Sequence, residues 1–338
     1  ELQKVMRFLD KEENKSAVVT ILLQDRVERR FIEEAFASVP GLSDYVFDVR
    51  DYIRDDHWPT LQQIIDSHKR ILFFVENLNG EYSTPAKPIY LAKGSNFKVE
   101  NTYNLGSTTS DNWECVTRWS DIPLTTPYAS EVGFTSWPRL FTLNQFHTLF
   151  SSPAHAAQID NNLTWLEHRI DRACAVANEK RLIPNFLALD YSQVGDAVAY
   201  AGALTEGGVY FYEDNNGVSE AHPDSTLHAG PTSALNSDVV CVLPTSVEWD
   251  IRLKAAGCEN DETRSLALRG VKKGTSIKVF DQPNASKSDD YTVINVLRDI
   301  GLSERVVVGS YERSYTNADV EVTYHPHNGL DGKVSHII

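Results

Sequence analysis

The segment RLIPNFLALDYSQVGD, residues Arg181–Asp196, is the most informative stretch of this chain. Its apolar residues Phe186–Leu189 predict a buried strand that ends at Asp190 and Tyr191, and the next apolar run predicts a helix over Ala197–Leu204. An acid at the end of a buried strand costs free energy unless it forms an ion pair or hydrogen bonds, or takes part in function. Barrel enzymes place their catalytic residues at such strand ends. Asp190 therefore has two interpretations: a functional group, or a structural residue that caps the next helix or pairs with an arginine.

The residues before this segment alternate between strand-like and helix-like patterns. Ala17–Leu23 and Ile71–Val75 are continuous apolar runs, which are typical of strands buried on both faces. Shorter strands are predicted at Val46–Val49 and Leu140–Leu143, and an amphipathic helix at Ala156–Ala177. Such alternation indicates a parallel sheet with right-handed crossovers. We therefore predict a TIM-like α/β barrel whose N-terminal part is missing from this chain, because about six strands can be counted where a barrel needs about eight.

Polar side chains follow the predicted strands, and a barrel would gather them on one rim. The long stretch Leu78–Pro138, rich in tyrosine and tryptophan, predicts a lid or binding loop. The polar residues at the strand ends are Asp25, Asp48, Glu76, Asn77, Asn144 and Asp190.

The sequence pattern changes at Gly208. Short apolar runs are now separated by turn pairs such as Asn216-Gly217 and Asn328-Gly329, and long helical runs are absent. This pattern predicts an all-β Greek-key sandwich. The predicted domains are accordingly a barrel portion over residues 1–206 and a β-sandwich over residues 207–338.

Composition and charge exclude several classes of protein. With 338 residues and a formal net charge of −15, the chain lacks the basic face that a nucleic-acid binder needs. No apolar run approaches the roughly 20 residues of a transmembrane segment. The cysteines form no close CxxC pair, so we expect two disulfides rather than a zinc site, with Cys115–Cys174 and Cys241–Cys258 favoured over the other two pairings. Disulfides favour a secreted, extracellular protein.

The order of segments in roughly the first 204 residues resembles phosphatidylinositol-specific phospholipase C-like phosphodiesterases. The resemblance rests on RILFFVEN (Arg70–Asn77), LFTLNQF (Leu140–Phe146) and PNFLALDYSQVGD (Pro184–Asp196), with cysteines between them. It implies a distorted (β/α) barrel and a two-step cleavage in which the inositol 2-hydroxyl attacks phosphorus. In that family two histidines act as general base and general acid, a task that suits groups titrating near neutral pH.

The chain departs from this family at the acid–base residues. The family's histidines follow its first two strands, and this chain is expected to begin after the second, so none of its histidines matches them. His147, just past a predicted strand end, is the histidine of most interest, and Gln145 stands where relatives often have histidine. The missing strands either come from a separate or cleaved chain or are absent from this piece, or the scaffold serves binding alone. A barrel without two strands would expose unpaired edges, which favours the first two explanations.

The resemblance implies a phosphoric diester hydrolase acting on an inositol phospholipid, a glycosyl-inositol anchor or a related phosphodiester. Asp190, Tyr191 and Glu76 are the predicted catalytic residues, and a missing N-terminal segment or partner chain would supply the histidines. The alternative is a catalytically inactive secreted protein that binds a glycan or a surface. The predicted substrate-binding residues are Asp25, Arg50, Asn77 and Asn144.

The second half resembles a βγ-crystallin-type Greek-key domain, most closely over Cys258–Ile338. Relatives of that family bind calcium through paired acids, which Asp289 and Asp290 match, although Val293 and Ile294 replace the expected hydroxyl residues. Carboxylates in a loop can supply several of calcium's six to eight oxygen ligands. Calcium is the only cofactor considered, and a solvated acidic turn is the alternative.

Overall fold

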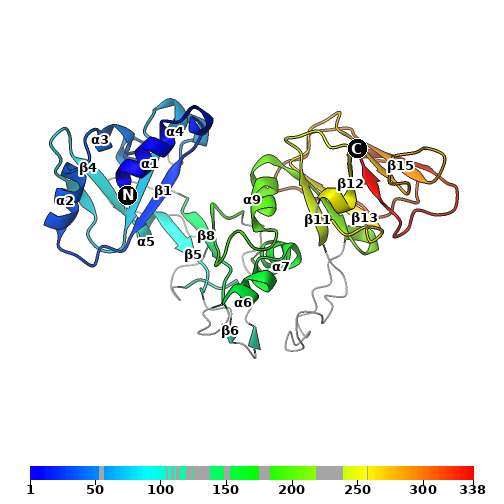
Figure 1. The fold of residues 1–338 in the computed structure, drawn as a ribbon, viewed down its shortest axis with the longest axis horizontal. Helices are drawn as coiled ribbons and strands as arrows, with labels where there is room; N and C mark the ends of the chain where they lie inside the picture. The colour runs from blue at the N-terminus through cyan, green and yellow to red at the C-terminus, as the bar shows by residue number, and fades with distance from the viewer. Residues whose placement is uncertain are drawn as a thin grey trace. The chain divides into compact units, whose positions relative to one another are not determined.

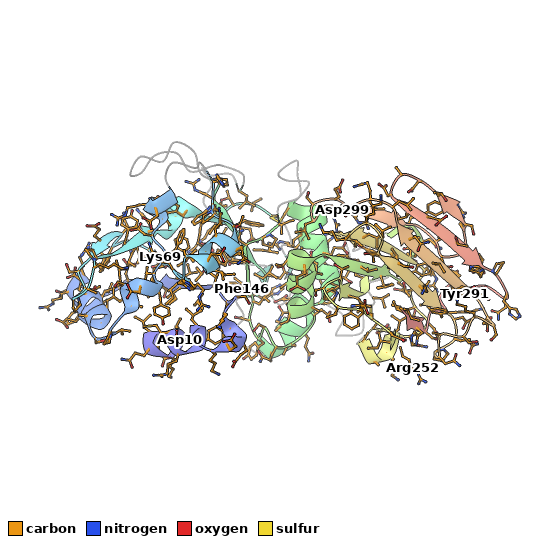
Figure 2. The ribbon with its side chains drawn as sticks, turned by 90° about the horizontal axis from the view of Figure 1, so that it is seen from above. Asp10, Lys69, Phe146, Arg252, Tyr291 and Asp299 are labelled. Atoms are coloured by element: carbon orange, nitrogen blue, oxygen red, sulfur yellow. A yellow bond between two sulfur atoms is a disulfide. The ribbon has the colours of Figure 1, made fainter. Side chains whose placement is uncertain are left out.

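The computed structural model divides the chain into two compact units. The N-terminal unit contains Glu1–Glu100 and Trp119–Thr142, and the C-terminal unit contains Asn101–Arg118 and Leu143–Ile338. Figure 1 shows the elements of both, and Figure 2 shows the ribbon turned by 90° with the side chains drawn as sticks. The structure describes residues 1–52, 57–103, 106–107, 110–111, 115–118, 124, 138–147, 153–174, 183–217, 239–256 and 258–338.

A four-stranded sheet forms the centre of the N-terminal unit. Its strands are β1 (Val19–Leu23), β2 (Ile71–Val75), β3 (Gly80–Tyr82) and β4 (Ile89–Lys93). They lie in the order β1-β2-β4-β3, with β1, β2 and β4 parallel and β3 antiparallel to β4. The helices are α1 (Leu2–Leu9), α2 (Arg29–Ala37), α3 (Leu42–Tyr45), α4 (Leu61–Asp66) and α5 (Gly94–Phe97), with 3-10 helices η1 (Glu12–Asn14) and η2 (Val49–Tyr52).

Strand β2 contributes to two hydrophobic cores, and all of its residues are buried. Ile71, Phe73 and Val75 pack with side chains of α1, α2 and α3. Leu72 and Phe74 pack instead with side chains of α4 and α5. Because successive side chains of a strand point to opposite faces, helices cover both sides of this sheet. The prediction of a strand buried on both faces is confirmed for β2, whereas it is wrong for β1, which is half-buried and leaves Leu22 56% exposed.

The predicted α/β barrel is wrong for the residues that the structure describes. Strand β3 covers the outer edge of β4 in the antiparallel direction, so the sheet does not continue there as a parallel ring. A second parallel pair, β5 (Lys98–Glu100) and β8 (Leu140–Asn144), belongs to a different sheet. The architecture is a mixture of helices and sheets with no closed barrel among the described strands.

The segment Val46–Val49, predicted as a strand, makes only an isolated bridge from Val46 to Ile71. The Asp48 carboxylate then accepts a hydrogen bond from the Arg50 backbone N–H at 2.9 Å, which turns the chain into η2. Conversely, the stretch predicted as a long loop contains β3, β4 and β5, together with the short hairpin β6 (Gly106–Ser107) and β7 (Ser110–Asp111).

The helical part of the C-terminal unit contains α6 (Pro153–Asp160), α7 (Leu163–His168) and the π-helix η3 (Arg169–Cys174). The single helix predicted over this region is interrupted because the Asn162 side chain accepts a hydrogen bond from the Thr164 N–H at 2.9 Å and starts a new helix. Strand β9 (Phe186–Ala188), which is half-buried rather than buried, and α9 (Ala197–Glu206) follow.

Two antiparallel sheets complete the C-terminal unit. The first has the order β11-β10-β13-β16 and the second the order β12-β19-β14-β15-β18-β17. Val209 and Phe211 of the first sheet share one core with Ile277 and Ile294 of the second. The strands are β10 (Gly208–Tyr212), β11 (Val239–Pro244), β12 (Ile251–Arg252), β13 (Ser265–Arg269), β14 (Ser276–Phe280), β15 (Tyr291–Val296), β16 (Val306–Val308), β17 (Tyr315–Thr316), β18 (Val320–His325) and β19 (His336–Ile337), with 3-10 helices η4 (Asn215–Gly217) and η5 (Leu253–Ala256).

The prediction of a purely all-β fold for this part is corrected, because the C-terminal unit mixes helices with the two sheets. The predicted domain boundary between residues 206 and 207 stays a prediction. Helices α7 and α9 pack against β11 of the first sheet, beside which they lie in Figure 1. Tyr200 of α9 meets Tyr210 of β10 edge-on at 6.2 Å between ring centroids. The same strand thus faces the helices on one side and the second sheet on the other, which gives three layers.

A buried polar cluster lies between the helices and the first sheet. Glu167 of α7 accepts a hydrogen bond from the Tyr212 hydroxyl and lies 3.7 Å from the Arg269 guanidinium. All three side chains are at most 3% exposed. Burial raises the pKa of the Tyr212 phenol, and the Glu167 charge adds to that rise. The cluster joins the helical layer to the sheet through charges that water does not reach.

Both predicted disulfides are present. Cys115 is bonded to Cys174 and Cys241 to Cys258, with sequence separations of 59 and 17. In the chain-entropy model, loops of these lengths correspond to about 4 and about 3 kcal/mol of stabilisation. No helix in the described ranges is long and apolar enough to cross a bilayer.

Candidate functional site

The turn after β9 is held by one buried amide. The Asn161 side chain is fully buried, and its Nδ2 donates to the carbonyl oxygens of Asp190, Tyr191 and Val194 at 3.0, 3.2 and 3.1 Å. The Asn161 carbonyl in turn accepts the Asp196 N–H at 2.9 Å. A single residue on the loop between α6 and α7 therefore fixes the backbone from Asp190 to Asp196, through its side chain up to Val194 and through its own carbonyl at Asp196.

The same turn exposes its side chains. Tyr191 has a φ of 48°, in the left-handed region that non-glycine residues rarely adopt, and is 42% exposed. Gly195 has a φ of 77°, and a Cβ there would lie 2.8 Å from the Asn161 carbonyl oxygen. Strained backbone that its surroundings hold in place is common at functional sites. The Asp190 carboxylate is exposed as well.

Neither structural role considered for Asp190 is seen among the described residues. The N-cap position of α9 belongs to Asp196, whose carboxylate accepts the Leu163 N–H at 3.1 Å instead of capping its own helix. No arginine in the described part of the chain forms an ion pair with Asp190. The carboxylate is therefore accessible to a ligand.

His147, just past the end of β8, is paired with Asp160. Its Nδ1 lies 2.7 Å from Asp160 Oδ1, and its backbone N–H donates to Oδ2 at 3.0 Å. Both side chains are buried, 7% and 2% exposed for the two residues. The Asp160 carboxylate orients the His147 imidazole. Burial lowers the pKa of Arg169 to about 10, and the negative charge of Asp160 opposes part of this decrease.

Asp25 follows β1 and binds the backbone beyond β2. Its carboxylate accepts the N–H groups of Glu76 at 3.0 Å, Asn77 at 3.1 Å and Leu78. Burial opposes ionisation, but these backbone donors outweigh it and hold the pKa below its usual range. Asp25 thereby builds the turn that carries Glu76 and Asn77, whose own side chains are exposed.

Arg50 is surrounded by partners in the N-terminal unit. Its Nε and Nη2 bind Asp48 at 3.0 and 2.7 Å, and its Nη1 binds Glu81 at 2.7 Å. The guanidinium lies 4.3 Å from the Tyr90 ring centroid. The hydrogen bonds to Asp48 raise the pKa of Arg50, and the hydrogen bond to Glu81 raises it further. Burial opposes this increase without cancelling it. The Asp48 and Glu81 carboxylates thus already offset the positive charge of Arg50, which was predicted to bind the substrate.

Asn144 is buried and forms a reciprocal pair with Asn101. The Asn144 N–H donates to Asn101 Oδ1 at 2.7 Å, and Asn144 Nδ2 donates to the Asn101 carbonyl at 2.8 Å. This pair ties the end of β8 to the segment that follows β5.

The predicted residues therefore divide by exposure. Asp25, Arg50 and Asn144 are bound by other groups of the protein, whereas Glu76, Asn77, Asp190 and Tyr191 present exposed side chains. Glu76 and Asn77 of the N-terminal unit lie on the turn after β2, and Asp190 and Tyr191 of the C-terminal unit lie on the turn after β9. That these side chains meet on one rim stays a prediction.

Two supporting residues, Asn161 and Asn101, were not predicted from the sequence, because nothing in the local sequence distinguishes a buried amide from a loop amide.

The predicted calcium pair has partners of its own. Asp289, Asp290 and His327 place ligand atoms within 4.8 Å of one another. Asp290, however, accepts hydrogen bonds from the Tyr324 hydroxyl at 2.5 Å and from the N–H groups of His327 and Asn328 at 2.9 and 2.6 Å. Burial opposes ionisation, yet these donors hold the pKa of Asp290 well below its usual range. The arrangement favours a carboxylate that organises the loop after β18.

Comparison with known proteins adds two observations. The PI-PLC X family model, described as PI-PLC X 1, matches residues 1–205. A PI-PLC X domain-containing protein 1 from Arthroderma benhamiae is 29% identical over 112 residues, which are 33% of this chain and 34% of that protein. The chain thus aligns with about a third of that relative's length. No solved structure matches the chain.

Proposed function

The chain belongs to the PI-PLC X family, and from this premise we propose that it forms part of a phosphoric diester hydrolase acting on an inositol phosphodiester. The observation that carries the proposal is the turn at Asp190 and Tyr191, inside the family-matching region. Its backbone is fixed by a buried amide while its carboxylate and phenol are exposed. Fixed backbone with accessible polar groups is what orientation of a substrate requires.

In the proposed reaction the inositol 2-hydroxyl oxygen attacks phosphorus and transfers its proton to a base. The oxygen of the lipid alcohol leaves and takes a proton from an acid, and a cyclic phosphate results. Asp190 accepts a hydrogen bond from an inositol hydroxyl and so orients the sugar, and the Tyr191 phenol donates to a phosphate or hydroxyl oxygen. Glu76 and Asn77 are proposed to contact the same substrate.

The acid and the base are proposed to be histidines from polypeptide outside these 338 residues, because no histidine here matches the family's two positions. Asp25, Arg50 and Asn144 receive a supporting role in place of direct contact, since backbone or side-chain groups of the protein already bind them. The two disulfides support a secreted, extracellular protein.

The test is hydrolysis of phosphatidylinositol vesicles by the full native protein with and without Asp190→Asn. We expect the variant to lose about 10²–10³-fold in turnover, which is typical when one preorganised hydrogen-bonding group is removed. Asp66→Asn is a matched control, because Asp66 is an exposed acid on α4 whose carboxylate, within the described part of the chain, accepts a hydrogen bond from Gln62 alone. Equal turnover of wild type and Asp190→Asn would remove Asp190 from the reaction.

A second candidate function is binding without turnover. It is favoured by the internal hydrogen bonds of Arg50, whose guanidinium is already bound by Asp48 and Glu81. This candidate expects co-sedimentation with phosphatidylinositol vesicles that Asp190→Asn weakens, and no released inositol phosphate from the full native protein. Release of product by that protein would exclude it.

A further inference from the structure

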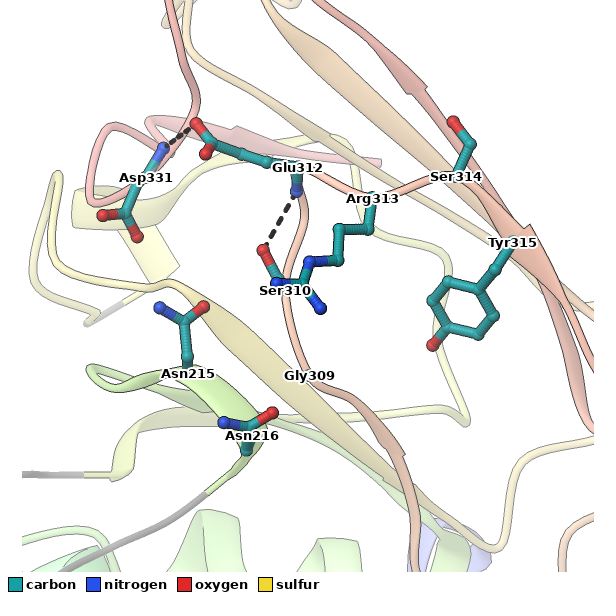
Figure 3. Close-up of a pocket in the computed structure, with 9 residues that line it drawn as sticks. All are labelled: Asn215, Asn216, Gly309, Ser310, Glu312, Arg313, Ser314, Tyr315 and Asp331. Carbon is teal, nitrogen blue, oxygen red and sulfur yellow. Dashed lines mark hydrogen bonds between the residues drawn. The ribbon is translucent and has the colours of Figure 1, made fainter.

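A polar pocket lies in the C-terminal unit, outside the residues that match the PI-PLC X family. Its volume is about 790 Å³, within the range of roughly 300–1,000 Å³ for small-molecule sites. Figure 3 shows how three segments enclose it: the turn of η4, the segment from Gly309 to Tyr315, and the loop at Asp331.

The walls of this pocket are held by internal hydrogen bonds. The Asn216 N–H donates to the Gly309 carbonyl at 2.8 Å, and a Cβ on Gly309 would lie 2.8 Å from Asn216 Oδ1. Glu312 Oε1 accepts the N–H groups of Leu330 and Asp331 at 2.6 and 3.0 Å. The three segments are therefore tied to one another, so a ligand would meet a preformed site and bind with little loss of conformational freedom.

Several polar groups remain open to a ligand. Arg313, Asn215 and Asn216 are exposed, and their side chains have no hydrogen-bond partner among the described residues. In Figure 3 the Arg313 and Tyr315 side chains point towards the side of the pocket that carries the two asparagines. The Ser310 hydroxyl accepts the Glu312 N–H at 3.2 Å and keeps its own proton to donate. The pocket thus offers donors and acceptors together with the face of one aromatic ring.

The charges of the lining argue against an anionic ligand. Arg313 carries one positive charge, whereas Glu312 and Asp331 carry two negative charges. Arg264 lies 3.4 Å from Asp331, so that two cations and two carboxylates balance to no net charge. A phosphate or sulfate would find no excess positive charge to balance its own, and an acyl chain would leave these polar groups without water or a partner.

We propose that this pocket binds a neutral carbohydrate. Sugar hydroxyls both donate and accept, and neighbouring hydroxyls fit the paired donors of a guanidinium or the donor and acceptor of an amide. The half-buried Tyr315 ring would pack against the C–H face of the sugar. The ligand would thereby satisfy both the polar groups and the ring, which no anion and no lipid chain does.

The test is isothermal titration of the full chain with glucose, galactose, mannose, N-acetylglucosamine and their β-linked disaccharides, with inorganic phosphate as the anionic probe. We expect saturable binding of at least one sugar and none of phosphate. Arg313→Ala and Asn215→Ala should each weaken binding about tenfold, equivalent to about 1.4 kcal/mol. Tyr315→Phe, which keeps the ring, should weaken it less.

Lys272→Ala is the matched control, because it removes an exposed cation of the same unit that lies outside the pocket. Melting curves of all variants establish that each has folded. Failure of every sugar to bind, phosphate binding as tight as sugar binding, or wild-type affinity in Arg313→Ala would each overturn the proposal. Loss of phosphatidylinositol hydrolysis in Asp190→Asn does not bear on it, since the two sites share no residue.

Discussion

Two turns that follow strands in this molecule are each held by one buried polar side chain, but the direction of the hydrogen bonds is opposite in the two turns. After β2, the buried Asp25 carboxylate accepts the backbone N–H groups of Glu76, Asn77 and Leu78. After β9, the buried Asn161 amide donates to three backbone carbonyls. In the first turn a predicted substrate-binding residue, Asp25, supports the backbone. In the second turn Asn161, which was not among the predicted site residues, does so and leaves Asp190 exposed. Burial decides which polar residue at a strand end supports the turn and which can meet a ligand.

The largest effect is expected for Asp25→Ala. The substitution leaves three backbone N–H groups without their charged acceptor, and we expect a loss of about 3 kcal/mol or more in the stability of the N-terminal unit. Hydrogen exchange at the amides of Glu76, Asn77 and Leu78 should become faster. Asp66→Ala is the control, and unchanged exchange in Asp25→Ala would show that the carboxylate does not hold this turn.

Asn161→Ala should cost somewhat less, about 2 kcal/mol, because the donor is neutral and the carbonyls it leaves can find water at the exposed turn. Limited proteolysis between Asp190 and Asp196 should increase while the melting temperature falls. Ser192→Ala, at an exposed residue of the same turn, is the control. Wild-type resistance to proteolysis in Asn161→Ala would break the comparison between the two turns.

The two turns should also differ in their response to acid. The folded-state pKa of Asp25 lies below its unfolded value of about 4, so its stabilisation is fully present above that pH and is lost as the pH falls through the folded pKa. Wild type should therefore lose protection at Glu76–Leu78 below about pH 4 more steeply than Asp25→Asn does. The neutral Asn161 gives no such dependence, and parallel acid profiles of wild type and Asp25→Asn would contradict this account.

The smallest effect on stability is expected for the exposed side chains. Asp190→Asn and Tyr191→Phe should change the free energy of unfolding by less than about 0.5 kcal/mol, because surface substitutions away from special features rarely do more. The same variants are expected to impair substrate cleavage or binding. A destabilisation as large as that of Asn161→Ala, seen in chemical denaturation, would mean that Asp190 also supports the turn.

The sequence predicted what depends on local pattern. The continuous apolar run of β2 predicted burial on both faces, and the even, widely spaced cysteines predicted the disulfide pairing. The family resemblance over the first part of the chain is confirmed by the match over residues 1–205. These features follow from side-chain periodicity and residue type, which are readable along the chain.

The errors arose where distant residues compete with local pattern. Val46–Val49 looks like a strand, but the Asp48 side chain turns the backbone within it. The prediction of a barrel failed because β3, a short strand inside an aromatic-rich stretch, pairs with the outer edge of β4 in the antiparallel direction. The supporting roles of Asp25 and Asn161 depend on partners 51 to 53 and 29 to 33 residues away. Periodicity carries no information about such pairs.

The buried cluster of Glu167, Tyr212 and Arg269 limits how the family-matching region can be recombined with other domains during evolution. An acid at position 167 is tolerated because β10 and β13 supply its partners. Transfer of the family-matching region without these sheets would remove the Tyr212 and Arg269 partners of this buried acid, and breaking a buried ion pair typically costs about 3–5 kcal/mol. Relatives that lack these sheets should therefore carry a neutral residue where this chain has Glu167, and that position becomes a marker in alignments for shared ancestry of both halves.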